Sequence, residues 1–318
     1  MNEAEDRGVG SFAGYGFALA VPGKYYEPPH DPPAGPTPRV RAWSPLFNFP
    51  WQGPACQIAA GVSIVTGASY TGYEGEAAKR FLSVEELEEC RSIGHWLEVD
   101  QTLPDEITIR ARNNCFLLAL WLTKPTRTHL SLRFEEIEGG EYLVARILER
   151  FQWIEGQVSE ELLSSDLARV RRILPTLLSI YAASRRLRNA LVLTFRGCTS
   201  TDWQSSYICL TAAVEALLTC SNGRGLMRRL ADSFALVTSS SENERKAQRE
   251  HFKRLYSVRS EIMHGRSHDR RNAEFNLRDL AAMRDALRSL WDRILESDGL
   301  RVALEADDRS RATFFRTL

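Results

Sequence analysis

The chain has 318 residues, a formal net charge of zero and 43% hydrophobic residues, which excludes a largely disordered protein. Its length allows two domains of ordinary size. The first residues, MNEAEDRGVGSF, are acidic and lack the apolar core of a secretory signal. The most apolar run, Tyr207 to Leu218, is too short to cross a bilayer and contains Glu215. We therefore expect a cytoplasmic protein that does not enter the membrane.

The six cysteines are scattered, with no CxxC pair and no histidine at zinc-finger spacing. This pattern predicts reduced, mostly buried thiols, and neither a metal site nor a cofactor is expected. His264 and His268 are four residues apart, but Gly265 breaks the helix between them, so they are not expected to share a metal ion.

Basic residues are concentrated in two stretches of the C-terminal half. Seven arginines and no acidic residue lie between Arg169 and Arg196, and twelve basic residues face six acidic ones between Arg224 and Arg271. Such stretches either hold the phosphate backbone of RNA or form solvated helix faces that are paired locally. The sequence leaves both interpretations open.

Residues 1–140 are predicted to form a mixed α/β domain. Ten of the thirteen prolines precede Ala55, which predicts a loop or an extended arm there. Ser83 and Glu86 form a capping box that predicts a helix of about twelve residues ending near His95. Strands are predicted from β-branched and aromatic content, or from alternation, at residues 56–67, 107–112, 115–122 and 128–136. Gly139 and Gly140 are the predicted domain boundary.

Residues 141–318 are predicted to form an all-helical bundle, so that the whole chain belongs to the α+β class. A helical period begins at Tyr142, and a longer helix begins at Ser165 and Asp166, is kinked or broken at Pro175 and ends near Phe195. Further helices are predicted at residues 204–220, 224–237, 242–264 and 277–297, the last with Asn276 and Asp279 at its cap positions.

Arg259 is an unusual residue for its position in the helix 242–264. At about 100° per residue it lies near the middle of an apolar face made by Phe252, Leu255, Val258, Ile262 and Met263. A guanidinium cannot lose its proton, so a buried one needs a partner. Glu215 is the only charged residue between Trp203 and Gly223, and it needs a cation for the same reason. We expect an ion pair between them, which either locks two core helices together or orients Arg259 toward a phosphate.

His264 precedes Gly265, which suits the left-handed position after a helix end, so the histidine is predicted in the final turn. The helix dipole favours an imidazolium there, and Ser260 is expected to orient the ring by a hydrogen bond. An imidazole beside a guanidinium is suited to cleavage of a phosphodiester. Arg259 and His264 are about 140° apart on an ideal helix, so we expect two copies of the chain to meet across a two-fold axis.

The runs AAVEALLTC, GLMRRLADSFALV and FKRLYSVRSEIMHG resemble the HEPN superfamily, and most closely its Apea-like branch. Arg259, Ser260 and His264 match the superfamily's pattern of an arginine, a polar residue and a histidine, with four residues between the first and the last. The resemblance covers about Thr194 to Leu295. It implies a helical domain, usually dimeric, that cleaves RNA without a metal ion by attack of the 2′-hydroxyl on the adjacent phosphate.

The resemblance also implies a role for each site residue. His264 would be the general acid or base, Arg259 would stabilise the developing charge, Ser260 would orient and Glu215 would position Arg259. Nearby basic side chains are expected to bind RNA, namely Lys253, Arg254, Arg266, Arg270 and Arg271. Such an enzyme would act in antiviral defence or in a stress response. The alternatives are a non-catalytic HEPN module for dimerisation or nucleotide binding, and an antitoxin-like scaffold that only binds RNA.

Overall fold

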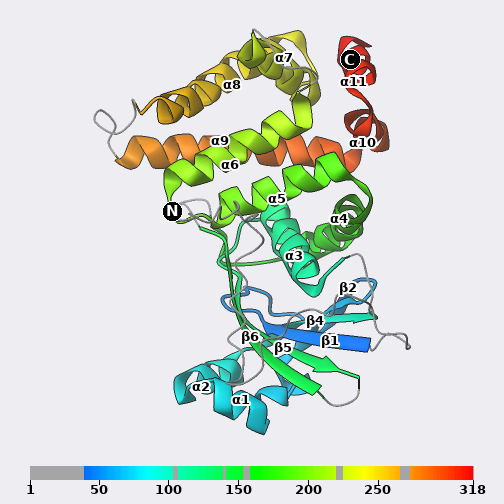
Figure 1. Ribbon diagram of the computed structural model, residues 1–318, viewed down its shortest axis with the longest axis vertical. Helices are drawn as coiled ribbons and strands as arrows, with labels where there is room; N and C mark the ends of the chain where they lie inside the picture. The colour runs from blue at the N-terminus through cyan, green and yellow to red at the C-terminus, as the bar shows by residue number, and fades with distance from the viewer. Residues whose placement is uncertain are drawn as a thin grey trace, which may run out of the picture. The chain divides into compact units, whose positions relative to one another are not determined.

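The structure, a computed structural model, describes residues 39–102, 107–138, 141–152, 158–219, 225–265 and 273–317. One antiparallel sheet is followed along the chain by helices, which confirms the α+β class (Figure 1). Within the described ranges, no helix combines the length and the apolar character that a bilayer crossing requires.

The sheet has six strands in the order β2-β3-β4-β1-β5-β6. They are β1 (Arg39–Pro45), β2 (Cys56–Ala59), β3 (Val62–Thr66), β4 (His95–Thr102), β5 (His129–Ile137) and β6 (Glu141–Arg150). Gly61 makes the tight turn between β2 and β3 at a φ of +65, where an added Cβ would lie 2.4 Å from the carbonyl oxygen of Asp100. Most of the proline-rich stretch lies outside the described residues, but Arg39–Pro45 is a central strand instead of an arm.

Helices cover both faces of the sheet. On one face, Trp43, Trp96 and Phe134 pack with Tyr70 and Tyr73 in an aromatic cluster beside two short helices, α1 (Glu76–Phe81) and α2 (Val84–Ser92). The other face packs against α3 (Ile109–Thr123). It contributes Val40, Ala42, Val62, Ile64, Leu97 and Val99 to a hydrophobic cluster that continues into the C-terminal helices. The sheet and the helical part therefore share one core.

The prediction of two strands at residues 107–122 is wrong, because this segment is helix α3. Thr108 caps the helix by accepting a hydrogen bond from the Ala111 N–H at 3.2 Å. Every residue from Cys115 to Leu122 is buried, since α3 lies between the sheet and the next helix. A helix that is buried on all sides has no apolar period, and its sequence is then indistinguishable from a buried strand.

The helix predicted from Tyr142 onward is also wrong, because residues 141–150 form strand β6 and pair with β5. The predicted boundary after residue 140 therefore falls inside a hairpin, between two paired strands. The segment YLVARILER contains good helix formers, but pairing with β5 outweighs that weak local preference.

The C-terminal part consists of eight described helices. They are α4 (Ser164–Ala183), α5 (Arg185–Thr199), α6 (Trp203–Leu218), α7 (Leu226–Thr238), α8 (Glu242–Met263), α9 (Ala273–Glu296), α10 (Asp298–Glu305) and α11 (Asp308–Thr317). Pro175 lies inside α4 without ending it, and the break comes at Ser184, whose hydroxyl caps α5. Helix α9 begins at Ala273, so the cap expected at Asn276 is wrong. The sequence did not predict α10 and α11.

The capping box of α2 is present as predicted. The Ser83 hydroxyl accepts from the Glu86 N–H at 3.2 Å, and the Glu86 carboxylate accepts from the Ser83 N–H at 2.8 Å. The helix ends at Ser92, earlier than predicted, because His95 already belongs to β4. The same carboxylate binds both Nε and Nη2 of Arg146, at 3.1 and 2.8 Å. Glu86 therefore connects α2 to strand β6. The hydrogen bond from Arg146 lowers the pKa of the Glu86 carboxyl group.

Replacement of Glu86 by alanine removes both the oxygen that accepts from the Ser83 N–H and the ion pair with Arg146. We expect a loss of about 1–2 kcal/mol of unfolding free energy at pH 7, measured by urea denaturation. A depressed folded-state pKa gives stability above the unfolded pKa that disappears as the pH falls, so the difference from wild type should shrink below about pH 4. Glu88 is exposed on the same helix, and Glu88→Ala is the matched control. Equal losses of unfolding free energy from the two changes would contradict the role of Glu86 in the cap and in the ion pair.

Candidate functional site

Glu215 lies in the last turn of α6, a helix that is apolar on most sides because α5, α8 and α9 pack around it. Asp202 caps the start of the helix by accepting from the Ser205 N–H at 2.8 Å. The Glu215 side chain is 22% exposed, so it is half-buried, at the edge of the core. It needs a cation, and the helix supplies none.

Arg259 lies in the last turns of α8, which begins with a capping box between Ser241 and Glu244. Phe252, Leu255 and Val258 of the predicted apolar face are buried, but Met263 is 58% exposed. The buried part of α8 therefore ends near Arg259, whose side chain is 30% exposed. Arg259 is at the margin of the buried face, whereas the sequence placed it in the middle.

The expected ion pair between α6 and α8 is present, with Nε of Arg259 3.0 Å from Oε1 of Glu215. A third residue joins it that the sequence analysis missed. The Tyr256 hydroxyl donates to the same Oε1 at 2.7 Å, and the Arg259 guanidinium lies 5.5 Å from the centre of the Tyr256 ring. Burial, followed by the hydrogen bond to Glu215, raises the pKa of Tyr256 to about 12, so the tyrosine is a neutral donor. Its position three residues before Arg259 was the available signal.

The contacts of Arg259 occupy only one side of its guanidinium. The buried Nε–H lies near Glu215 but is not directed at the oxygen, so the contact is an ion pair without a well-formed hydrogen bond. The two terminal amino groups make no hydrogen bond with any described residue. A planar group held at one edge, with free donors at the other, is suited to bind an anion.

Comparisons with known protein families, with curated proteins and with solved structures find no match to this chain.

His264 is at the end of α8, as predicted. Gly265 takes a φ of +66, and its N–H donates to the Ile262 carbonyl at 3.1 Å. The imidazole is exposed. The hydrogen bond expected from the Ser260 hydroxyl to the ring is not formed. The hydrogen bond between these residues is a backbone one, from the His264 N–H to the Ser260 carbonyl at 3.1 Å. The described contacts leave the imidazole unoriented.

The residues predicted to bind RNA differ in their surroundings. Lys253 pairs with Glu250 at 2.7 Å, and the exposed Arg254 lies 3.2 Å from Nδ1 of His251. Burial, and then the charge of Arg254, lowers the pKa of His251. The remaining three predicted residues lie outside the described part of the chain: Arg266, Arg270 and Arg271.

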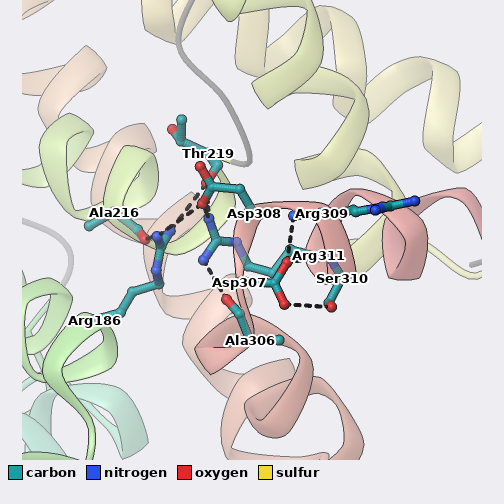
Figure 2. A network of polar contacts seen from close by, with 9 residues as sticks. All are labelled: Arg186, Ala216, Thr219, Ala306, Asp307, Asp308, Arg309, Ser310 and Arg311. Carbon is teal, nitrogen blue, oxygen red and sulfur yellow. Dashed lines mark hydrogen bonds and ion pairs between the residues drawn. The ribbon is translucent and has the colours of Figure 1, made fainter.

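Two arginines from other helices bind the C-terminal end of α6 (Figure 2). Arg186 of α5 donates to the carbonyls of Ala216 and Thr219 at 3.3 and 3.1 Å. Arg311 of α11, only 1% exposed, donates to the Thr219 carbonyl at 2.9 Å. Asp308 accepts from Arg311 and lies 3.6 Å from Arg186. Cations are favourable where a helix leaves its carbonyls without partners, so this network fixes the turn that carries Glu215.

A pocket of about 320 Å³ between α4, α9 and α10 contains none of the predicted site residues. Its charged lining residues are Arg169, Arg172, Asp292, Glu296, Asp298 and Arg301. Two of these arginines already pair with carboxylates of the lining. Among the described residues, no group of three or more His, Cys, Asp or Glu side chains is arranged to hold a metal ion.

A double-mutant cycle on Glu215→Gln and Arg259→Met should give a coupling free energy of about 1 kcal/mol, because both side chains are half-buried. Tyr256→Phe should cost about 1 kcal/mol, because it removes a donor to a half-buried carboxylate. The measurement is urea unfolding at neutral pH. The Tyr181 hydroxyl makes no hydrogen bond with another described residue, and Tyr181→Phe is the matched control. Strict additivity of the first two changes would refute the pairing.

Proposed function

We propose that the chain is a metal-independent endoribonuclease of the HEPN type. The observation that supports this proposal best is the cluster of Glu215, Tyr256 and Arg259, which holds a guanidinium with its terminal amino groups free. His264 follows at the exposed end of the same helix. A fixed cation and an accessible imidazole are the groups that phosphodiester cleavage requires.

In the proposed reaction, the ribose 2′-hydroxyl attacks the adjacent phosphorus atom. The bond from phosphorus to the 5′-oxygen of the next nucleotide breaks, leaving a 2′,3′-cyclic phosphate and a 5′-hydroxyl. His264 moves protons as general acid or base, and Arg259 stabilises the charge that develops on the phosphate oxygens. Glu215 and Tyr256 position Arg259. Ser260, exposed beside Arg259, is the polar residue of the motif, and its proposed role is to orient the substrate.

A homodimer is part of the proposal. Arg259 and His264 point in directions about 140° apart on an ideal helix, so a composite site made by two copies brings them together more readily than one copy does. The exposed Met263, between them in sequence, supports an interface at this end of α8 because large apolar side chains are unfavourable in water.

The cellular role follows from the chemistry proposed. An RNA-cleaving enzyme of this kind would act in the cytoplasm, in antiviral defence or in a stress response. The free thiols of the described cysteines agree with a reducing compartment. The second candidate is a non-catalytic HEPN module for dimerisation or nucleotide binding. The unoriented His264 favours it, because a general acid or base needs a defined geometry.

Incubation of the purified protein with labelled RNA in EDTA tests the enzyme against the module. We expect fragments that end in a cyclic phosphate, with cleavage reduced about 10²–10⁴-fold by His264→Ala and about 10²–10³-fold by Arg259→Ala. His251 lies on the same helix, and His251→Ala should cleave like wild type. Cleavage that requires a metal ion, or that survives His264→Ala, would contradict the mechanism. Absence of cleavage with every RNA would favour the module.

A further inference from the structure

Three arginines follow one face of α5. Arg185 and Arg196 are exposed and Arg188 is half-buried, with the exposed Asn189 between them. At about 100° per residue, these four residues fall within a sector of about 100°, and they span about 16 Å along the helix axis. We call this row of Arg185, Arg188 and Arg196 the arginine face of α5. Its length matches about five stacked nucleotides at 3.4 Å each.

The arginine face lacks the carboxylates that neutralise other arginines of this protein. Arg146, Arg169 and Arg259, for example, each pair with a glutamate or an aspartate. None of the three α5 arginines has an ion pair with a described residue; Arg188 instead lies over the Tyr181 ring at 5.9 Å. Two acidic groups lie near the start of α5 but contact other atoms: Glu305 accepts from the Leu187 N–H at 3.0 Å, and Asp308 lies 3.6 Å from Arg186.

The arginine face borders an uncharged strip of α6, made by Ile208, Cys209 and Ala212, that leads to Glu215 in the candidate site. Helices α5 and α6 run side by side, with an added Cβ at Gly197 reaching within 2.7 Å of Leu210 (Figure 1). The outer side of α6 exposes parts of Ile208, Cys209 and Ala212, which carry no charge, before it reaches Glu215. Burial raises the pKa of the Cys209 thiol, and the charge of Arg196 acts in the opposite direction. Together with the close approach of Gly197 to Leu210, this places the arginine face beside the strip.

We propose that the arginine face of α5 binds the phosphate backbone of single-stranded RNA and leads the strand across α6 to Arg259. This inference rests on the proposed ribonuclease function and adds the path of its substrate. Cations without counter-ions that share one helix face attract a polyanion by releasing its condensed ions. A single strand is required because the 2′-oxygen must line up with the phosphorus bond that breaks, and an A-form duplex does not allow that geometry.

The surface around the arginine face argues for a nucleic acid over a lipid membrane. Peripheral membrane helices place large apolar side chains beside their cations. The large apolar side chains that are exposed in the described residues all lie on other segments: Val84, Leu143, Leu163, Met227, Met263, Leu277 and Val302. The uncharged strip of α6 offers only small or half-buried groups, which suits the flat faces of bases.

The test combines binding and cleavage in the full-length protein. The variant Arg185→Gln/Arg188→Gln/Arg196→Gln is compared with Arg80→Gln/Arg293→Gln/Arg316→Gln, which removes the same charge from exposed positions elsewhere. The probe is a fluorescent uridine oligonucleotide of about 20 nucleotides with uncleavable 2′-fluoro sugars. We expect the α5 variant to bind about tenfold more weakly and to lose about 2 from the slope of log K against log salt. KM for cleavable RNA should rise while kcat stays unchanged.

Alkylation of Cys209, measured by mass spectrometry of its peptide, provides an independent readout. The oligonucleotide should protect this half-buried thiol in the wild type and in the control variant, but not in the α5 variant. Equal binding by the two triple variants, or no protection of Cys209, would overturn the proposed path. Tighter binding of a duplex than of the single strand would overturn the choice of substrate. Because the probe cannot be cleaved, these outcomes do not depend on whether the protein is a nuclease.

Discussion

The ion pair between Glu215 and Arg259 is the interaction on which the candidate site depends. Helix α6 is surrounded by other helices, so each polar group at its ends requires a partner from a different element. Asp202 satisfies its first turn, Arg186 and Arg311 satisfy its last carbonyls, and α8 supplies the cation for Glu215. Three separate segments, α5, α8 and α11, therefore fix the last turn of α6. The same contacts that stabilise the helix leave the far side of a guanidinium open.

The parts of this arrangement that were predictable from the sequence are those with a local physical cause. A serine followed three residues later by a glutamate gives a capping box wherever an apolar segment follows, as at Ser83 and Glu86. Gly265 ends α8 because glycine adopts a left-handed φ without a steric penalty. The partner of Arg259 was predictable for another reason. A charge on an apolar helix demands a counter-charge, and Glu215 was the obvious candidate in the neighbouring helix.

The features that the sequence did not predict depend on tertiary contacts. The segment Cys115–Leu122 of α3 is buried on all sides and therefore has no polar face to set a period. Strand β6 has the composition of a helix and is a strand only because β5 pairs with it. The Tyr256 hydroxyl reaches from α8 to Glu215 of α6. Its spacing of three residues from Arg259 places the two side chains near each other on α8 but does not reveal the shared partner. Ser260 matches the motif, but its hydroxyl does not reach the ring of His264. The motif could not predict this, because it specifies residue types and leaves side-chain directions undetermined.

The contact between Arg311 and the Thr219 carbonyl joins residues that are 92 positions apart. During synthesis, α6 leaves the ribosome long before α11 exists, so the carbonyl end beside Glu215 stays without its buried guanidinium until α11 has been made. Domains form as their segments emerge, and here the closing contact comes last. A growing chain would thus carry an unfinished site until α11 has emerged and Arg311 has reached the Thr219 carbonyl.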